Sequence, residues 1–198
     1  TLKLLREFPQ VFGLAGVSFL SALAHVVFPA IFVLYAAHRY GWDARMVGFT
    51  LAAVGVSSTI VQAGLVRRIV PAIGERRALL FGLGCGVVGF LAYGYAPSGP
   101  WLWAAIPVMA FWGLCNPSIQ SLVTRQVGTH EQGRLQGALA SLVAIAGVLG
   151  PYLFTHVYAA GIDVRLDFGL PGAAFFFASA LLMVAWLLAE RVTRVRAA

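Results

Sequence analysis

The sequence predicts an all-α membrane protein with six transmembrane helices. Three observations predict this fold class: 60% of the 198 residues are hydrophobic, only 11% are charged, and the mean hydropathy is +0.85. Soluble domains are roughly 45–50% apolar and about 25% charged, so a water-soluble protein of this composition would expose large apolar patches and aggregate. The composition also excludes a disordered chain, and a content of two cysteines excludes a disulfide scaffold.

Six apolar segments have the length of about 20 residues that a membrane-spanning helix needs. In chain order, the predicted spans are 11–35, 46–66, 78–95, 101–123, 135–158 and 173–189, and together they form one domain, 1–198. Each span ends where charged or turn-forming residues begin, and these separators are 39–43, 67–77, 97–100, 125–134 and 161–172. No Asp, Glu, Lys or Arg lies in the central part of a span.

The basic residues predict the orientation in the membrane. Of the 14 Lys and Arg residues, Arg39 and Arg45 fall in the first connection and Arg165 in the fifth, and the other eleven lie on the opposite side. The positive-inside rule therefore places both termini in the cytoplasm, which agrees with an even number of crossings. The net charge of +7 is accounted for by these loops. It does not indicate nucleic-acid binding, which needs basic residues clustered on one face.

The N-terminal segment shows neither an initiator Met nor a signal peptide, because Thr1 is followed by charged residues and Pro9 without a cleavage site. We therefore expect the sequence to be part of a longer protein.

Polar residues at membrane depth predict a cavity. Such residues are costly in lipid and usually face a protein interior or a cavity. Three spans carry a polar and aromatic stripe with a spacing of three to four residues. The stripes are Ser18, Ser21, His25, Phe28, Phe32 and Tyr35 in the first span, Ser58 and Gln62 in the second, and Trp112, Asn116 and Gln120 in the fourth. They suit an amphipathic organic molecule, whereas the alternative is hydrogen bonding that only joins helices.

Glycine is abundant in the spans, with 22 residues in the chain. Gly82 and Gly86 form a small-xxx-small pair, which is typical of close helix packing in membranes. In the fifth span, Gly147 and Gly150 precede Pro151, and this combination predicts a bend in the helix.

The motifs of membrane enzymes and metal sites are missing from the sequence. Gly16-Val17-Ser18 and Gly55-Val56-Ser57 begin like a serine-protease motif but do not continue to glycine. HExxH, CxxC and Walker sequences are also missing. We therefore predict a protein that is not an enzyme and has no cofactor or metal site. All seven carboxylates lie outside the apolar centres, so His25 is the one titratable residue at mid-depth that could serve a proton pathway.

Four stretches of the sequence form recognisable motifs. They are the basic loop motif GLVRR (64–68), RYGWDARMVG (39–48), GERRALL (74–80), and QGRLQGALASL (132–142) with Gly150-Pro151. Together they resemble the C-terminal half of bacterial tetracycline exporters and other drug-efflux members of the major facilitator superfamily. The resemblance covers about residues 10–158. The sequence departs from the family where Arg replaces the acidic residue of the loop motif, and where Ser58 stands at a position that is His in some exporters.

The resemblance implies that the six helices are helices seven to twelve of a transporter in the bacterial inner membrane. That family exchanges a metal–tetracycline complex for protons by alternating access, through a cavity between two six-helix halves. The first, second, fourth and fifth helices of this chain would line the cavity, and the third and sixth would face lipid. The family's key membrane carboxylates belong to the other half.

From the stripes and the resemblance together, we expect two groups of functional residues. Residues contacting the drug or lining the proton pathway would be His25, Phe28, Ser58, Gln62, Trp112, Asn116 and Gln120. Arg67, Arg68, Arg76 and Arg77 would form a cytoplasmic gate by pairing with the N-terminal half. The expected partners are that half, lipid and a small-molecule drug. Two alternatives remain open: a symmetric homodimer of this chain, and a membrane scaffold that does not transport.

Overall fold

The computed structural model describes residues 9–128, 130–162 and 170–194. Within these ranges, six helices are long and apolar enough to cross a membrane, which confirms the predicted fold class. Their bounds are Gln10–Tyr40, Ala44–Ile73, Glu75–Tyr95, Gly99–Thr124, Gln132–Ile162 and Ala173–Arg194. Each is longer than its predicted span, because the hydropathy pattern marks the apolar part of a helix while charged and polar residues continue the helical hydrogen bonding beyond it.

Three of the six spans are not single regular helices. The first consists of α2 (Pro9–His25) and α3 (Val27–Tyr40), and the second of α4 (Ala44–Thr59), a π-helical segment (Ile60–Leu65) and α5 (Val66–Ile73). The fourth consists of α7 (Gly99–Ala110), a 3-10 segment (Phe111–Leu114) and α8 (Cys115–Thr124). The regular helices are α6 (Glu75–Tyr95), α9 (Gln132–Ile162) and α10 (Ala173–Arg194).

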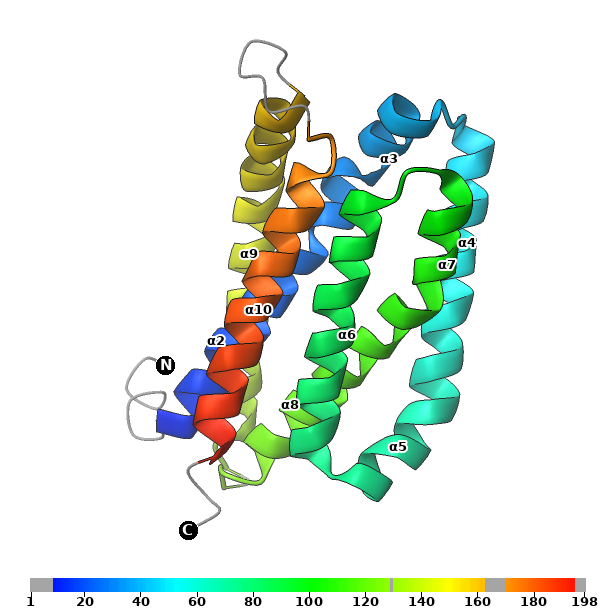
Figure 1. Cartoon of the computed structure of the whole chain (residues 1–198). Helices are drawn as coiled ribbons and strands as arrows, with labels where there is room; N and C mark the ends of the chain where they lie inside the picture. The colour runs from blue at the N-terminus through cyan, green and yellow to red at the C-terminus, as the bar shows by residue number, and fades with distance from the viewer. Residues whose placement is uncertain (1–8, 129, 163–169, 195–198) are drawn as a thin grey trace.

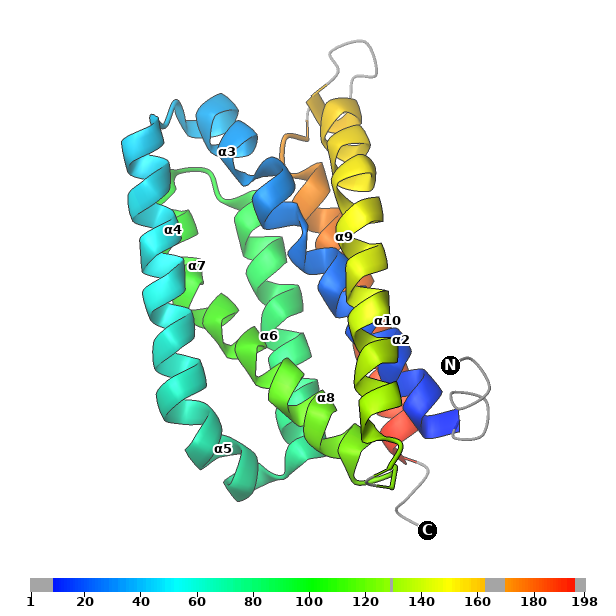
Figure 2. The ribbon, with the colours of Figure 1, turned by 180° about the vertical axis from the view of Figure 1, so that it is seen from behind.

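The helices form one bundle in which α6 and α10 pack against each other (Figure 1). Helix α10 also packs on α2, α2 packs on α9, and α6 packs on α7 and α8. Helices α4 and α9 lie on opposite sides of the bundle in both views (Figure 2). The start of α2 and the end of α10 lie at the same end as α5, as an even number of crossings requires.

An aromatic cluster joins α3, α6 and α10. The ring of Tyr35 lies edge-on to Phe175 at a centroid distance of 4.8 Å, and its hydroxyl donates to the Tyr93 carbonyl at 2.8 Å. Phe32 and Tyr35 are fully buried here. The outer part of the first predicted stripe therefore belongs to the core, because α3 turns this face toward α6 and α10.

Glycines of α6 allow the close approach of neighbouring helices. A Cβ atom on Gly82 would lie 2.9 Å from the Cys115 sulfur, and one on Gly86 would lie 2.6 Å from Leu182. Lipid provides no hydrophobic drive between helices, so close van der Waals packing at small residues stabilises the bundle. This confirms the packing role predicted for the pair.

The fifth span is one continuous helix. Helix α9 runs through Pro151 without a break, and the bend at Gly147, Gly150 and Pro151 stays a prediction. Gly150 provides a contact surface, since a Cβ there would lie 2.6 Å from the Val26 side chain. Val26, the residue that Gly150 contacts, is where the first span is interrupted between α2 and α3.

Candidate functional site

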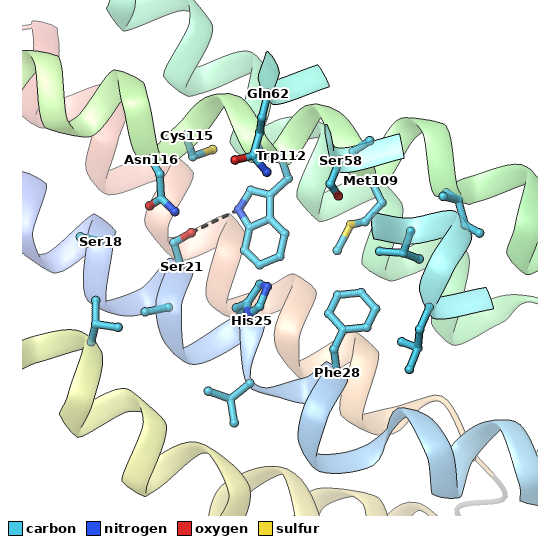
Figure 3. A pocket seen from close by; sticks show the side chains of 18 of the residues that line it. Ser18, Ser21, His25, Phe28, Ser58, Gln62, Met109, Trp112, Cys115 and Asn116 are labelled. Carbon is cyan, nitrogen blue, oxygen red and sulfur yellow. Dashed lines mark hydrogen bonds between the residues drawn. The ribbon is translucent and has the colours of Figure 1, made fainter. Parts of the chain in front are cut away.

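A pocket of about 460 Å³ lies inside the bundle (Figure 3). Among the described residues, its lining comes from the first, second, fourth and fifth spans and from neither α6 nor α10. These are the four spans that the resemblance implied. The pocket brings together six of the seven residues expected at the site, namely His25, Phe28, Ser58, Gln62, Trp112 and Asn116. Its volume lies within the roughly 300–1,000 Å³ typical of small-molecule sites.

Trp112 forms the centre of the site. Its indole Nε1 donates to Ser21 Oγ at 3.2 Å, and its ring centroid lies 5.6 Å from that of His25. Behind the ring lies Gly86 of α6, where a Cβ would approach the indole to 3.1 Å. A glycine on a helix outside the pocket thus sets the position of the main aromatic surface inside it.

The polar groups of the pocket are available to a ligand. In the part of the chain that the structure describes, the side chains of His25, Gln62 and Asn116 make no hydrogen bond to protein, and all three line the pocket. No described Asp, Glu, Lys or Arg is among the lining residues. The site therefore offers aromatic surface with amide, hydroxyl and imidazole groups, which suits a flat molecule carrying several hydrogen-bonding groups.

Two prolines explain why the first and fourth spans are irregular at the pocket. Proline has no N–H to bond the carbonyl four residues earlier, and its ring clashes with that carbonyl. Pro29 acts in this way on His25, and the chain turns at Val26 between α2 and α3. Pro117 acts on Gly113, which lies in the 3-10 segment. The same rule applied to the sequence would have marked both positions, but it would also have marked Pro107 and Pro151, which lie inside the uninterrupted helices α7 and α9.

Two glycines, each four residues before a proline, bring backbone to the wall of the pocket. Gly113 and Gly147 are lining residues, and neither has a side chain to present. Gly147 stands four residues before Pro151, so its carbonyl also lacks the usual helical donor. Backbone carbonyls freed in this way need other partners at membrane depth, and a ligand with hydroxyl or amide N–H groups can supply them.

Gln62 lies in the π-helical segment of the second span. π-helical turns are rare in proteins, and those that occur are often found at functional sites. Here the segment brings the Gln62 side chain against Gly113 of the neighbouring span, where a Cβ would lie 3.2 Å from Gln62 Cγ. The sequence marks Gln62 through its polarity at membrane depth, but no proline marks this irregularity.

Gln120 is not among the lining residues, although the four-residue spacing from Trp112 and Asn116 grouped it with them. Its side-chain oxygen accepts a hydrogen bond from Gln136 Nε2 of α9 at 2.6 Å. Asn116 and Gln120 are four residues apart within α8 and share a helix face, but Gln120 lies one turn farther along α8, beyond the residues that line the pocket. Gln120 thus joins α8 to α9 beside the pocket.

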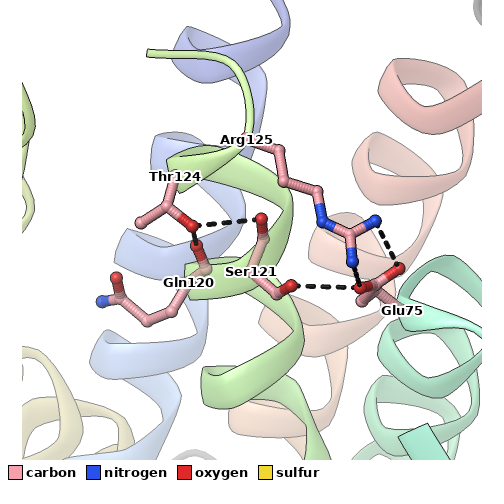
Figure 4. A network of polar contacts seen from close by, with 5 residues as sticks. All are labelled: Glu75, Gln120, Ser121, Thr124 and Arg125. Atoms are coloured by element: carbon pink, nitrogen blue, oxygen red, sulfur yellow. Dashed lines mark hydrogen bonds and ion pairs between the residues drawn. The ribbon is translucent and has the colours of Figure 1, made fainter. Parts of the chain in front are cut away.

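The arginine-rich end of the bundle contains a polar network (Figure 4). Glu75, the first residue of α6, pairs with Arg125 at 2.5 Å and accepts a hydrogen bond from Ser121 at 3.1 Å. Of the four arginines expected at a gate, Arg76 donates to Thr193 of α10 at 3.0 Å, and Arg67, Arg68 and Arg77 are exposed. The network fixes α6 to α8 at this end.

Several lining residues were not among the expected site residues, and they include Leu51, Met109, Gly113 and Cys115. All four are apolar or small, so hydropathy does not distinguish them from residues that face lipid. Ser18 and Ser21 belong to the first stripe and do line the pocket.

Comparisons with known proteins agree with this architecture. The family model described as Major Facilitator Superfamily matches residues 1–151. The class C tetracycline resistance protein of Escherichia coli is 33% identical over 153 residues, which cover 76% of this chain and 38% of that protein. The class G tetracycline resistance protein of Vibrio anguillarum is 34% identical over 148 residues, covering 75% of this chain and 38% of that protein.

A solved structure shows the same fold. The crystal structure of the human organic anion transporter MFSD10 (TETRAN) superposes with a TM-score of 0.75 at 24% identity, covering 93% of this chain and 41% of that one. The chain thus spans less than half the length of its relatives. The match to the family model and to the tetracycline resistance proteins establishes that the chain belongs to the Major Facilitator Superfamily, and its six helices have the fold of one half of such a transporter.

Proposed function

We propose that the chain is the C-terminal half of a drug-efflux transporter that exports tetracycline-like molecules. The observation that carries this proposal is the pocket itself, which four spans line and in which aromatic rings and unbonded polar side chains from the first, second and fourth spans meet at membrane depth. A tetracycline is a flat, fused-ring molecule with oxygens along its edge, and it would place its rings on Trp112 and Phe28. Any divalent metal would enter with the drug as part of the substrate.

The partner in this proposal is an N-terminal six-helix half that covers α4 and α9. In the apolar windows of these helices only 11% and 28% of residues are buried, against 56% for α6. Both helices contribute lining residues to the pocket, including Ser58 of α4 and Gly147 of α9. A second half placed against them would close the pocket, and rocking of the halves would open it to one side at a time.

Proton coupling in this proposal involves His25 together with carboxylates of the partner half. His25 brings an imidazole to the lining, and imidazole is a common proton carrier in proteins. Its ring lies between Trp112 and Phe28, so protonation would place a positive charge against the aromatic surface where the drug binds. Antiport results if drug and proton compete for this position.

Binding to the chain tests the site. A variant that retains Trp112 as its one tryptophan is placed in lipid nanodiscs and titrated with tetracycline, with indole fluorescence as the readout. Asn116→Ala and Gln62→Ala each remove one hydrogen-bonding group, so the Kd should rise about ten-fold in each. Ser118→Ala is the matched control, because Ser118 is buried on the same helix and donates to the Leu114 carbonyl at 2.7 Å. Equal effects of Ser118→Ala and Asn116→Ala would contradict the site.

Transport tests the mechanism. The complete transporter containing this chain is assayed for tetracycline uptake into inverted membrane vesicles, with and without a pH gradient. Uptake should need the gradient, and His25→Gln should remove that dependence while drug binding persists. Uptake that is indifferent to the gradient would exclude proton antiport. Cross-linking followed by intact mass then decides between an N-terminal half and a second copy of this chain as the partner.

A further inference from the structure

A second pocket, of about 610 Å³, lies at the end of the bundle opposite the arginine-rich loops. It is formed where the connection between α3 and α4 meets the connection between α6 and α7. Three aromatic side chains line it, Tyr40, Trp42 and Trp103, together with Met46 and the segment Pro97, Ser98, Gly99 and Pro100. We refer to these residues as the outer pocket.

The walls of the outer pocket are fixed by specific contacts. The Tyr40 hydroxyl donates to the Ala96 carbonyl at 2.9 Å, and the rings of Tyr40 and Trp42 lie 5.1 Å apart. Trp42 packs on Gly99, where a Cβ would approach the indole to 2.6 Å. The chain enters this turn through Gly41, whose φ of 65° lies in the left-handed region that glycine adopts at low cost. The aromatic surfaces are therefore preformed.

The outer pocket and the central pocket are both lined by α4 and α7, which pack against each other. On α4, Met46 lines the outer pocket and Val54 lines the central one, with Thr50 midway at four-residue spacing. On α7, Trp103 lines the outer pocket and Ile106 the central one. Residues three or four apart share a helix face, so one continuous face of each helix serves both pockets.

A hydrogen bond joins α4 to α7 beside the outer pocket. Trp103 Nε1 donates to Thr50 Oγ1 at 3.0 Å, and Thr50 is fully buried. Thr50 Oγ1 also donates to the Met46 carbonyl at 2.9 Å, which fixes its rotamer. These bonds hold the Trp103 ring, which lines the outer pocket.

The lining indicates which molecules fit. No ionisable side chain of the Asp, Glu, Lys, Arg or His type lines the outer pocket in the part of the chain that the structure describes. Indole and phenol rings bind other flat rings by offset or edge-to-face stacking. From the preformed aromatic walls and the uncharged lining, we propose that the outer pocket is a second binding site, for an uncharged, flat aromatic molecule. This proposal does not depend on which drug the central pocket binds.

Contact quenching of tryptophan tests this proposal. The probe is 4-bromobenzanilide, an uncharged molecule of two rings joined by an amide, whose bromine quenches indole fluorescence only at short range. It is titrated into nanodiscs that carry variants retaining Trp42, Trp103 or Trp101 as the one tryptophan, with phenylalanine elsewhere. Trp101 is the matched control. It lies in the first turn of α7, the helix that carries Trp103, but it is 66% exposed and does not line the pocket.

Quenching should saturate for Trp42 and Trp103, while for Trp101 it should rise linearly with probe dissolved in the lipid. In the Trp103 variant, Trp42→Ala in place of Trp42→Phe removes one aromatic wall of the outer pocket. The Kd of the probe should then rise about ten-fold. Equal saturation at Trp101, or a change of less than about two-fold on wall removal, would overturn the proposal. Displacement of the probe by short-chain phosphatidylcholine would assign the pocket to lipid and also overturn it.

The comparison between Trp103 and Trp101 does not use the Ala substitution, so it decides the matter even if the Ala variant does not fold. Trp112 reports on the central pocket separately. Failure at the outer pocket is therefore distinguishable from failure of the proposed drug site.

Discussion

The position of Trp112 illustrates how single residues decide the site. The indole is held on one side by Ser21 and backed on the other by Gly86 of α6. Neither partner belongs to the same span as Trp112. A glycine that sequence patterns assign to helix packing thus has a second role, because it leaves the space that the aromatic ring of the binding surface occupies.

This arrangement predicts a difference between two glycines of one helix. Gly86→Ala places a methyl group 2.6 Å from Leu182 and 3.1 Å from the Trp112 ring, and overpacking of this kind costs about 1–3 kcal/mol. Gly84→Ala meets nothing closer than 4.0 Å and should be neutral or slightly stabilising. Unfolding in mixed micelles measures both, and Gly86→Ala should also shift the Trp112 emission maximum. Equal stability of the two variants would contradict the packing.

Among the helices, the irregular segments position the polar residues. His25 ends α2, Gln62 lies in the π-helical segment, and Trp112 lies in the 3-10 segment. In a regular helix, each backbone carbonyl is bonded within its own helix. Each interruption frees backbone groups and rotates the helix beyond it, so the three elements direct side chains into one pocket.

Pro29 gives a test of this role. Pro29→Ala restores an N–H that can bond the His25 carbonyl, so α2 and α3 can join, and the free energy of unfolding should rise by up to about 3 kcal/mol. Ligand binding at Trp112 should weaken, because a continuous helix moves His25 and Phe28. Pro100→Ala is the control, since proline in the first turn of α7 interrupts no bond. If Pro29→Ala left both stability and binding unchanged, the break at Val26 would have another cause.

For the molecule as a whole, the proposed partner half predicts which apolar surfaces face lipid. Val148 of α9 is 77% exposed and Val88 of α6 is 56% exposed, so the chain by itself offers both to lipid. In the complete transporter only Val88 should remain accessible. Photolabelling from the lipid phase with a carbene reagent, read by mass spectrometry in native membranes, measures this difference. Strong labelling at Val148 would exclude a partner on α9.

Hydropathy and polarity along the chain were enough to predict the membrane class, the number and order of the spans, and six residues that meet in the central pocket. They were enough because the bilayer core contains no water, so every polar group at membrane depth must find a partner within the protein or in a cavity. Proline at positions 29 and 117 also carried a signal for the broken helices. The same reasoning grouped Gln120 with the site, but Gln120 does not line the central pocket. The bend that it assigned to α9 stays a prediction, and α9 is one continuous helix through Pro151.

How the helices meet could be learned from the folded chain alone. Its packing pairs Gln120 with Gln136, keeps α9 continuous, buries Tyr35 in the core and places Gly113 against Gln62. These outcomes depend on the phase of each helix after an interruption and on close contacts between spans far apart in the chain. Periodicity within one span contains neither quantity, whereas packing against the neighbouring helices fixes both.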